Sequence, residues 1–338
     1  MTALHIAWRT NRRAVLGWVL GLAVTMVFTA EAVAGLYDTP AKIQGYADAV
    51  TAGNALRAIN GNVEGINTLG GVIQDEFGFM ASFLLPLLGI SLVARMTRRE
   101  EERGRLELLL GGRLARHQPV VAALVITTAT IATTSVLFAA GLAVAGVAPG
   151  GAVLYALSLG ALALVFAGLA ALLAQVTLHA RGVYGGGLIL LAVAYVLRGV
   201  GDVTSAGWLT WLSPLGWQEK AAPFGPQRWW TLAIPLVVGL ALSLAALRLA
   251  TSRDLGSAVV RQGPGPDRAR PSMRTAWGFA AHVHRPTFLG WLAGAVLLTG
   301  MLGLLAQQMI DAILGNAAMA DAMGLSGSTS PLAGLTAA

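Results

Sequence analysis

The chain has 338 residues, of which 56% are hydrophobic and only 12% are charged, and its formal net charge is +7. This balance lies far outside the averages of soluble globular domains and indicates a membrane protein. Because the chain contains no cysteine, disulfides, thiolate nucleophiles and cysteine metal sites are excluded within it. The basic residues flank apolar segments and form no stripe interleaved with aromatic side chains, which argues against nucleic acid as a partner.

Long apolar segments recur along the chain. A helix needs about 20 apolar residues to cross ~30 Å of hydrocarbon, and in lipid only a helix or a closed barrel satisfies its own backbone hydrogen bonds. The sequence therefore predicts an all-α polytopic membrane protein. The segments long enough to span the bilayer are 14–36, 77–96, 119–147, 151–178, 183–201, 229–250 and 286–310.

The placement of arginine and lysine predicts the direction of these spans, because cytoplasmic segments carry an excess of both residues. If the N-terminus is cytoplasmic, most basic residues lie inside the cell. The outer segments then hold only Lys42, Arg57, Arg198, Lys220 and Arg228. We therefore expect a multi-pass protein of the cell membrane with a cytoplasmic N-terminus.

The first apolar segment is preceded by "TALHIAWRTNRR", residues 2–13. Its apolar residues and its arginines fall on opposite faces, which predicts a short interfacial helix. Within the span, Gly17 and Gly21 have the spacing that permits close approach of two helices. Glu31, near the outer end of the span, is a candidate contact for a cationic substrate, with a residue at headgroup level as the alternative.

The outer segment after the first span begins with Thr39 and Pro40. These residues are typical of the N-cap and the first position of a helix. The apolar residues that follow up to Val50 keep helical spacing, so the sequence predicts a short amphipathic helix at the outer face.

The most charged stretch of the chain is "TRREEERGRLELLLGGRLARH", residues 97–117, which follows the second span. Leucines at i, i+3, i+4 and i+8 and opposite charges at i and i+4 predict an amphipathic helix over residues 97–114. The predicted topology places this helix in the cytoplasm. A solvated loop helix without a partner explains the pattern as well as a docking helix does.

Two later segments contain helix-breaking residues. The outer segment "WLSPLGWQEKAAPFGPQRWW", residues 211–230, is rich in proline and tryptophan. Tryptophans at a span boundary usually belong to an interfacial belt, but Trp217 is also a candidate for a substrate path. Residues 252–284 contain "RQGPGPDRARP" and predict a cytoplasmic linker, which separates a first unit, 1–251, from residues 285–338.

An internal repeat relates the two units. The motif "RRAVLGWVLG", which begins at Arg12, returns as "RPTFLGWLAG", which begins at Arg285, and Gly290 and Gly294 repeat the helix-packing spacing of the first copy. Six spans separate the copies, so both enter the membrane in the same direction, as in a parallel repeat. We therefore expect a six-span unit followed by the first span of a second unit. A longer natural protein with five more spans is expected, with a seven-span protein as the alternative.

Three motifs carry a resemblance to a known family. "REEERGRLELLL" at 99–110, "WLSPLGWQ" at 211–218 and "RWW" at 228–230 resemble the ABC-2-type permeases of polyketide-antibiotic and multidrug exporters, the tetronasin-resistance-like group. The resemblance covers essentially the whole chain and implies two six-span halves. In that family the helix after the second span resembles a coupling helix that docks on an ATPase subunit.

Carried over to this chain, the resemblance implies a set of contacts with the ATPase. The candidate residues are Arg99, Glu100, Glu101, Gly104, Arg105 and Glu107. The chain departs from the family in length: it lacks most of the second half and therefore contains no second coupling helix.

The sequence also indicates where the energy for transport comes from. A Walker A loop needs a glycine directly before its lysine, but Lys42 follows Ala41 and Lys220 follows Glu219. The chain is therefore expected to be a transporter subunit without a catalytic site or a cofactor of its own. The resemblance implies a separate ABC ATPase, present in two copies, that binds ATP and Mg. The implied substrates are amphiphilic drugs or antibiotics.

Two other classes of function stay open. "GVGD", residues 199–202, together with Asp38 could form the carboxylate pair of an intramembrane aspartyl protease. Both aspartates lie at outer span ends, however, and Arg198 with Asp202 is better explained as an i,i+4 ion pair. The five histidines form no H-E-x-x-H motif, so no metal site is expected. A non-transporting sensor or assembly subunit is the other alternative.

Overall fold

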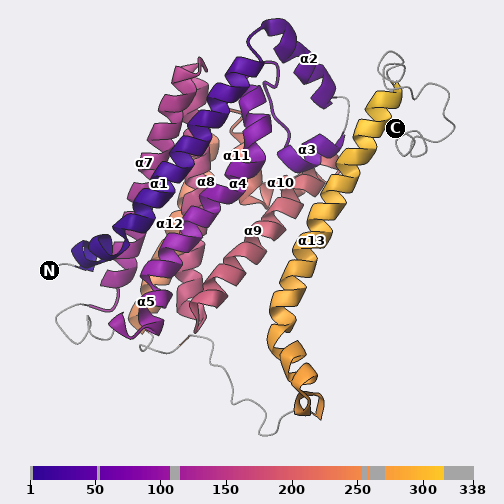
Figure 1. Ribbon diagram of the computed structural model, residues 1–338. Helices are drawn as coiled ribbons and strands as arrows, with labels where there is room; N and C mark the ends of the chain where they lie inside the picture. Colours follow the sequence, from indigo (N-terminus) through magenta and orange to yellow (C-terminus); the bar gives the residue numbers. More distant parts are fainter. Residues whose placement is uncertain (1–2, 52–53, 107–114, 253–257, 259–270, 316–338) are drawn as a thin grey trace. The chain divides into compact units, whose positions relative to one another are not determined.

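The computed structural model describes residues 3–51, 54–106, 115–252, 258 and 271–315. Every element within these ranges is a helix (Figure 1), which confirms the predicted all-α class. The chain divides into two compact units, Met1–Arg261 and Gln262–Ala338, and the division falls within the predicted linker.

Within its described part, the first unit contains six helices that are long and apolar enough to cross a membrane. They are α1 (Ala3–Leu36), α4 (Leu69–Met96), α7 (Gln118–Val144), α8 (Pro149–Val176), α9 (Ala180–Val203) and α12 (Ala233–Ser252). The short helix α5 (Arg98–Glu102) continues α4, and the 3-10 helix η1 (Trp229–Leu232) leads into α12. Each of these helices overlaps one of the first six predicted spans, and the protein is a multi-pass membrane protein.

Helix α8 lies at the centre of the first unit and packs against α4, α7, α9 and α12. Small residues let its neighbours approach closely, as is typical of helix packing in membranes. A Cβ at Gly160 would lie 2.5 Å from Ser135 Oγ of α7, and one at Gly168 would lie 2.7 Å from the Gly239 carbonyl oxygen of α12. On the periphery, α1 and α12 expose large apolar side chains, as helices that face lipid do.

Helix α1 runs without a break from Ala3 to Leu36. The predicted interfacial helix is therefore the first turns of this long helix and not a separate element. Asn11 is buried in these turns, and its Oδ1 accepts a hydrogen bond of 2.9 Å from Arg95 Nε at the end of α4. This contact ties α1 to α4 at the end of the unit that we call the base.

Four short helices cover the opposite end of the unit, which we call the cap. They are α2 (Pro40–Thr51), α3 (Asn54–Asn60), α10 (Trp208–Trp211) and α11 (Pro214–Lys220). Helix α2 begins at Pro40, so the helix predicted there is confirmed, while its location at the outer face stays a prediction. Asp75 near the start of α4 accepts hydrogen bonds from Tyr46 of α2 at 2.7 Å and from Asn60 of α3 at 3.1 Å, which fastens these two helices to the spans.

The described part of the second unit consists of the 3-10 helix η2 (Pro271–Arg274) and α13 (Ala276–Gly315). Helix α13 contains the predicted seventh span, 286–310, and begins upstream of it. Most of the predicted linker and residues 316–338 lie outside the described residues.

Candidate functional sites at the two ends of helix α9

The described part of the charged stretch lies at the base, where it starts with α5. The guanidinium of Arg98 is buried, with 1% of the side chain exposed, and its Nη1 lies 2.8 Å from Glu101 Oε1. Glu102 Oε1 accepts a hydrogen bond of 2.9 Å from the backbone N–H of Ala180, the first residue of α9. A carboxylate at this position satisfies an unpaired N–H and interacts favourably with the helix dipole. The stretch is thus tied into the unit.

The side chains proposed to contact the ATPase divide into two groups. Glu101 faces inward in its ion pair with Arg98, and its side chain is only 6% exposed. Glu100 and Arg105 lie nearer the surface, joined by a contact of 2.7 Å between Glu100 Oε1 and Arg105 Nη2. Arg105 is 43% exposed, so it is accessible to a partner.

Among the remaining candidate residues at the base, Gly104 lies at a bend in the chain. Gly104 has a φ of +68°, a left-handed conformation that glycine adopts without strain, and it lets the chain turn after α5. Arg99 is half-buried, while Glu107 lies outside the described residues. A shallow hollow of about 450 Å³ opens beside α5 and is lined by Arg98, Glu101, Glu102, Leu178 and His179.

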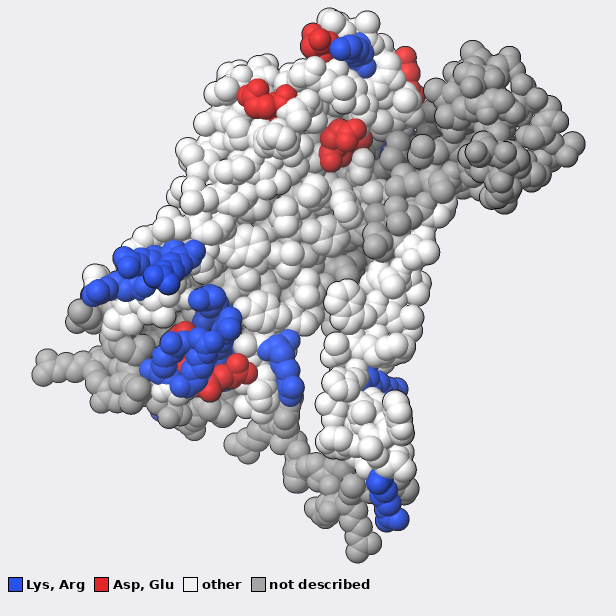
Figure 2. All heavy atoms as spheres, viewed as in Figure 1, with Lys and Arg blue, Asp and Glu red and all other residues white. Residues whose placement is uncertain are grey.

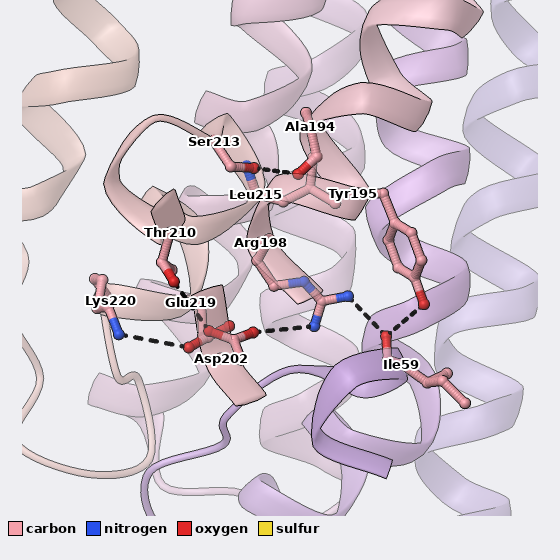
Figure 3. A network of polar contacts seen from close by, with 10 residues as sticks. All are labelled: Ile59, Ala194, Tyr195, Arg198, Asp202, Thr210, Ser213, Leu215, Glu219 and Lys220. Atoms are coloured by element: carbon pink, nitrogen blue, oxygen red, sulfur yellow. Dashed lines mark hydrogen bonds and ion pairs between the residues drawn. The ribbon is translucent and has the colours of Figure 1, made fainter. Parts of the chain in front are cut away.

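A second group of charged residues lies at the cap, and we call it the cap cluster: Arg198, Asp202, Glu219 and Lys220 (Figure 3). Arg198 Nη1 lies 3.7 Å from Asp202 Oδ2, which confirms the ion pair expected from the i,i+4 spacing. The pair is buried within the protein, because the side chains of Arg198 and Asp202 are only 4% and 1% exposed.

Arg198 also holds the end of α3. Its Nη2 donates a hydrogen bond of 2.7 Å to the carbonyl oxygen of Ile59. Tyr195, one turn earlier on α9, donates a second hydrogen bond of 2.9 Å to the same oxygen, and its ring centroid lies 4.8 Å from the guanidinium of Arg198 (Figure 3). Because α3 is short, these contacts are a main reason why it stays on α9.

Helices α10 and α11 join the cluster through Thr210, Glu219 and Lys220. Thr210 Oγ1 donates a hydrogen bond of 3.2 Å to Asp202 Oδ1, and Lys220 Nζ lies 3.7 Å from Glu219 Oε1. The side chain of Glu219 is 6% exposed, whereas that of Lys220 is 27% exposed. Burial, followed by the negative charge of Asp202, raises the pKa of Glu219 to about 8.

The glycines of the "GVGD" motif have a packing role. A Cβ at Gly199 would lie 2.8 Å from the carbonyl oxygen of Ala58 in α3, and one at Gly201 would lie 2.7 Å from the backbone nitrogen of Thr210 in α10. Both distances are too short for a real Cβ. The motif therefore lets α3 and α10 approach the end of α9, which sequence spacing alone did not reveal.

This geometry does not support the aspartyl-protease alternative. Asp202 contacts Arg198 and Thr210, while Asp38 is exposed and forms an ion pair of 2.7 Å with Lys42. The two aspartates thus belong to separate groups of contacts. Within the described ranges, the acidic, histidine and cysteine side chains also form no group of three or more that could hold a metal ion.

The other sequence candidates lie apart from one another. Trp217 Nε1 donates a hydrogen bond of 2.6 Å to the carbonyl oxygen of Trp211, whose ring stacks on Trp230 with centroids 6.1 Å apart. Trp217 therefore joins α10 to α11. Glu31 lies on an exposed face near the end of α1. A role of Glu31 or Trp217 in a substrate path stays a prediction.

The helix-packing glycines also stay predictions. In the part of the chain that the structure describes, a Cβ at Gly17, Gly21, Gly290 or Gly294 would meet no atom within 4 Å. The two glycines of α1 lie on its exposed face. Any helix that packs against them is therefore not among the described neighbours of α1.

Sequence reasoning missed three residues that the structure brings into these sites: Arg98, Glu102 and Glu219. Glu102 was one glutamate among three in a row, and nothing local distinguishes the one that reaches α9. A signal did exist for Glu219, since it directly follows the "WLSPLGWQ" motif and lies between two spans that carry few other charges.

Comparison with known proteins shows the family to which the chain belongs. Residues 1–249 match the family model described as the multidrug efflux system permease Rv1217c, C-terminal domain. The chain belongs to this family of multidrug permeases. The multidrug efflux system permease protein Rv1217c of Mycobacterium tuberculosis (strain ATCC 25618 / H37Rv) is 32% identical over 331 residues, which cover 97% of this chain and 60% of that relative's length.

The matched residues include both ends of α9 and all or nearly all of the six candidate spans. The family membership expected from the sequence motifs is therefore confirmed.

Proposed function

We propose that the chain is the membrane subunit of an ATP-driven ABC exporter that moves amphiphilic drugs or antibiotics out of the cell. The relative of 32% identity is described as a multidrug efflux permease, which supports this substrate class. ATP and Mg would be bound by a separate ABC ATPase in two copies, and neither lysine of this chain lies in a Walker A loop. The single observation that carries the proposal is the contact between α5 and the start of α9.

The distribution of charge supports a cytoplasmic N-terminus. On the face shown in Figure 2, basic side chains gather at the base, around the start of α1 and around α5, while acidic side chains predominate at the cap. Cytoplasmic segments of membrane proteins carry an excess of lysine and arginine. The base, and with it the N-terminus, would therefore face the cytoplasm, where an ATPase can reach α5.

A movement of α5 would be transmitted to two spans. Helix α5 follows α4 with only Thr97 between them, and Glu102 bonds to the first residue of α9. The buried pair of Arg98 and Glu101 would keep the shape of α5, because separating a buried ion pair is costly. Arg99, Glu100, Gly104 and Arg105 would then supply the contacts with the ATPase, with Glu107 as a further candidate.

The surface of the first unit also suits an amphiphilic substrate. A groove of about 430 Å³ between α7, α8 and α12 is lined almost wholly by apolar residues, with Thr128 and Ser135 as polar exceptions. A groove of this size can hold the apolar part of a drug-sized molecule. Glu31 and Trp217 remain candidates for contacts elsewhere along the path.

The test uses two ion pairs of equal length at opposite ends. The double variant Glu100→Ala plus Arg105→Ala removes the 2.7 Å pair at the base, and Asp38→Ala plus Lys42→Ala removes the 2.7 Å pair at the cap. We expect the base variant to reduce both co-purification with the ATPase and drug-stimulated ATP hydrolysis by about tenfold, equivalent to about 1.4 kcal/mol of lost interaction.

We expect the cap variant to retain both properties. Unchanged association and turnover in the base variant would remove the coupling role. Association with the ATPase without any movement of drug across vesicles would instead favour a sensor or assembly subunit.

A further inference from the structure

The cap cluster contains more buried carboxyl groups than buried cations. Arg198, Asp202 and Glu219 have side chains that are 4%, 1% and 6% exposed. If both carboxyl groups were ionised, this buried set would carry an excess negative charge. Lys220 does not fully balance it, because its ammonium is partly exposed and lies 3.7 Å from Glu219 Oε1. Burying an unbalanced charge is costly, and one added proton removes the imbalance.

Hydrogen bonding leads to the same conclusion. Among the described residues, neither oxygen of Glu219 has a hydrogen-bond partner, and Asp202 Oδ2 also lacks one. The carboxyl groups of Asp202 and Glu219 interact with each other and lie side by side in Figure 3. Ionised carboxylates are acceptors only, so two of them cannot bond without a proton between them.

We propose that Asp202 and Glu219 together bind one exchangeable proton, and that this proton helps to hold the cap on the end of α9. The proton would form a hydrogen bond from one carboxyl group to the other and so connect α9 to α11. Its loss would leave two negative charges in contact at a site with little water. The proposal goes beyond the proposed function, because it depends neither on an ATPase nor on the direction of the spans.

The surroundings of Glu219 contain few other charges. Helix α9 presents Arg198 and Asp202, and α11 presents Lys220. Helix α10 presents the hydroxyl of Thr210, which bonds to Asp202. The segment after α3 presents Gly61, whose φ of +103° and lack of a side chain leave room for Arg198 and Glu219: a Cβ there would lie 2.7 Å from Arg198 Nη1 and 3.0 Å from Glu219 Oε2.

Two further elements pack on α11 without adding a charge to the pair. Ser158 of α8 contacts Gln218, and Arg228, just before η1, donates to the Lys220 carbonyl oxygen while its guanidinium is paired with Glu64. The proton equilibrium is therefore set mainly by burial and by the other carboxyl group. Because the pKa of Glu219 is raised to about 8, a modest change of pH near neutrality would alter how often the site holds its proton.

The test is an infrared titration of the full chain in lipid nanodiscs, from about pH 5 to about pH 10, a window that brackets the raised pKa. We expect the wild-type protein to show the C=O band of a protonated carboxyl group that disappears with a midpoint near 8. Glu219→Gln should lack this band. Asp202→Asn should move the midpoint to lower pH by about one unit or more, because it removes a neighbouring negative charge.

Glu64→Gln is the matched control. It makes the same chemical change at another cap glutamate, one that is 35% exposed and paired with Arg228, and it should leave the band and its midpoint unchanged. The proposal is overturned if the wild-type protein shows no titrating carboxyl band, or if the band keeps its midpoint in Asp202→Asn. If Glu219→Gln does not fold, these two results still decide the question.

Discussion

The two ends of α9 are held by ionic contacts of different kinds. At the base, Arg98 is balanced by Glu101, and the carboxylate of Glu102 bonds to a backbone N–H of α9. At the cap, Arg198 faces both Asp202 and Glu219. At the base the buried cation is thus matched by one carboxylate, whereas at the cap two buried carboxyl groups share one buried cation and the proposed proton would balance them.

Because of this difference, the contacts at the two ends of α9 should respond differently to a change in their surroundings. A satisfied contact such as that of Glu102 keeps its geometry when the surroundings change, which suits the transmission of movement from α5. A contact whose strength depends on a proton can be weakened without removing any residue, so the proposed proton would make the attachment of the cap to α9 depend on pH. The contacts at both ends join α9 to other helices, so variants at the base and at the cap allow a direct comparison of the two ends.

The largest expected effect comes from removing the cation of the cap. Arg198→Ala leaves Asp202 and Glu219 without their shared partner and removes the hydrogen bond to Ile59. Breaking a buried ion pair in this way should lower the free energy of unfolding by about 3 kcal/mol. The measurement is thermal unfolding in detergent, and a loss below about 1 kcal/mol would show that the cluster is not buried in solution.

A somewhat smaller loss of stability is expected when a methyl group is added where α10 packs against α11. A Cβ at Gly216 would overlap the carbonyl oxygen of Thr210, while one at Gly207 would meet its nearest atom at 3.9 Å. Gly216→Ala should therefore destabilise the protein by about 2 kcal/mol, and Gly207→Ala should have little effect. Equal melting temperatures for the two variants would contradict the packing of the cap.

The pH dependence of stability has a definite sign at the cap. Folding raises the pKa of Glu219 from 4.5 to about 8, so the folded protein binds the proton more tightly than the unfolded chain does. The resulting stabilisation is complete below about pH 4.5 and is lost as the pH rises through about 8. The melting temperature should fall over this range in the wild-type protein and in Glu64→Gln. If the melting temperature of Glu219→Gln does not change over this range, the pH dependence arises in the cap cluster. If it falls as in the wild-type protein, the pH dependence has another origin.

The smallest loss of stability is expected at the base. Glu102→Gln keeps the shape of the side chain but removes its charge from the start of α9, which should cost about 0.5 to 1 kcal/mol. If the base transmits movement, drug-stimulated ATP hydrolysis should fall by more than this loss of stability explains. Arg103→Ala, at the exposed neighbouring position, is the control, and equal turnover in both variants would argue against transmission through Glu102.

Local features could be predicted from the sequence. The spans follow from length and hydropathy, because the thickness of the bilayer sets both in advance. The start of α2 at Pro40 and the pair of Arg198 with Asp202 depend only on residues within one turn of helix. Sequence reasoning could therefore predict each of them without knowing which helices are neighbours.

Only the tertiary structure decided what the charged residues contact. Glu102 reaches Ala180, Arg198 reaches Ile59, and Glu219 meets Asp202, and in each case the partners are distant in the sequence or lie on different helices. The packing of α4, α9 and α12 around α8 brings these segments together, and burial then determines which charges must pair. The same packing showed that the glycines of "GVGD" make room for α3 and α10, because a motif does not specify which backbone will lie against it.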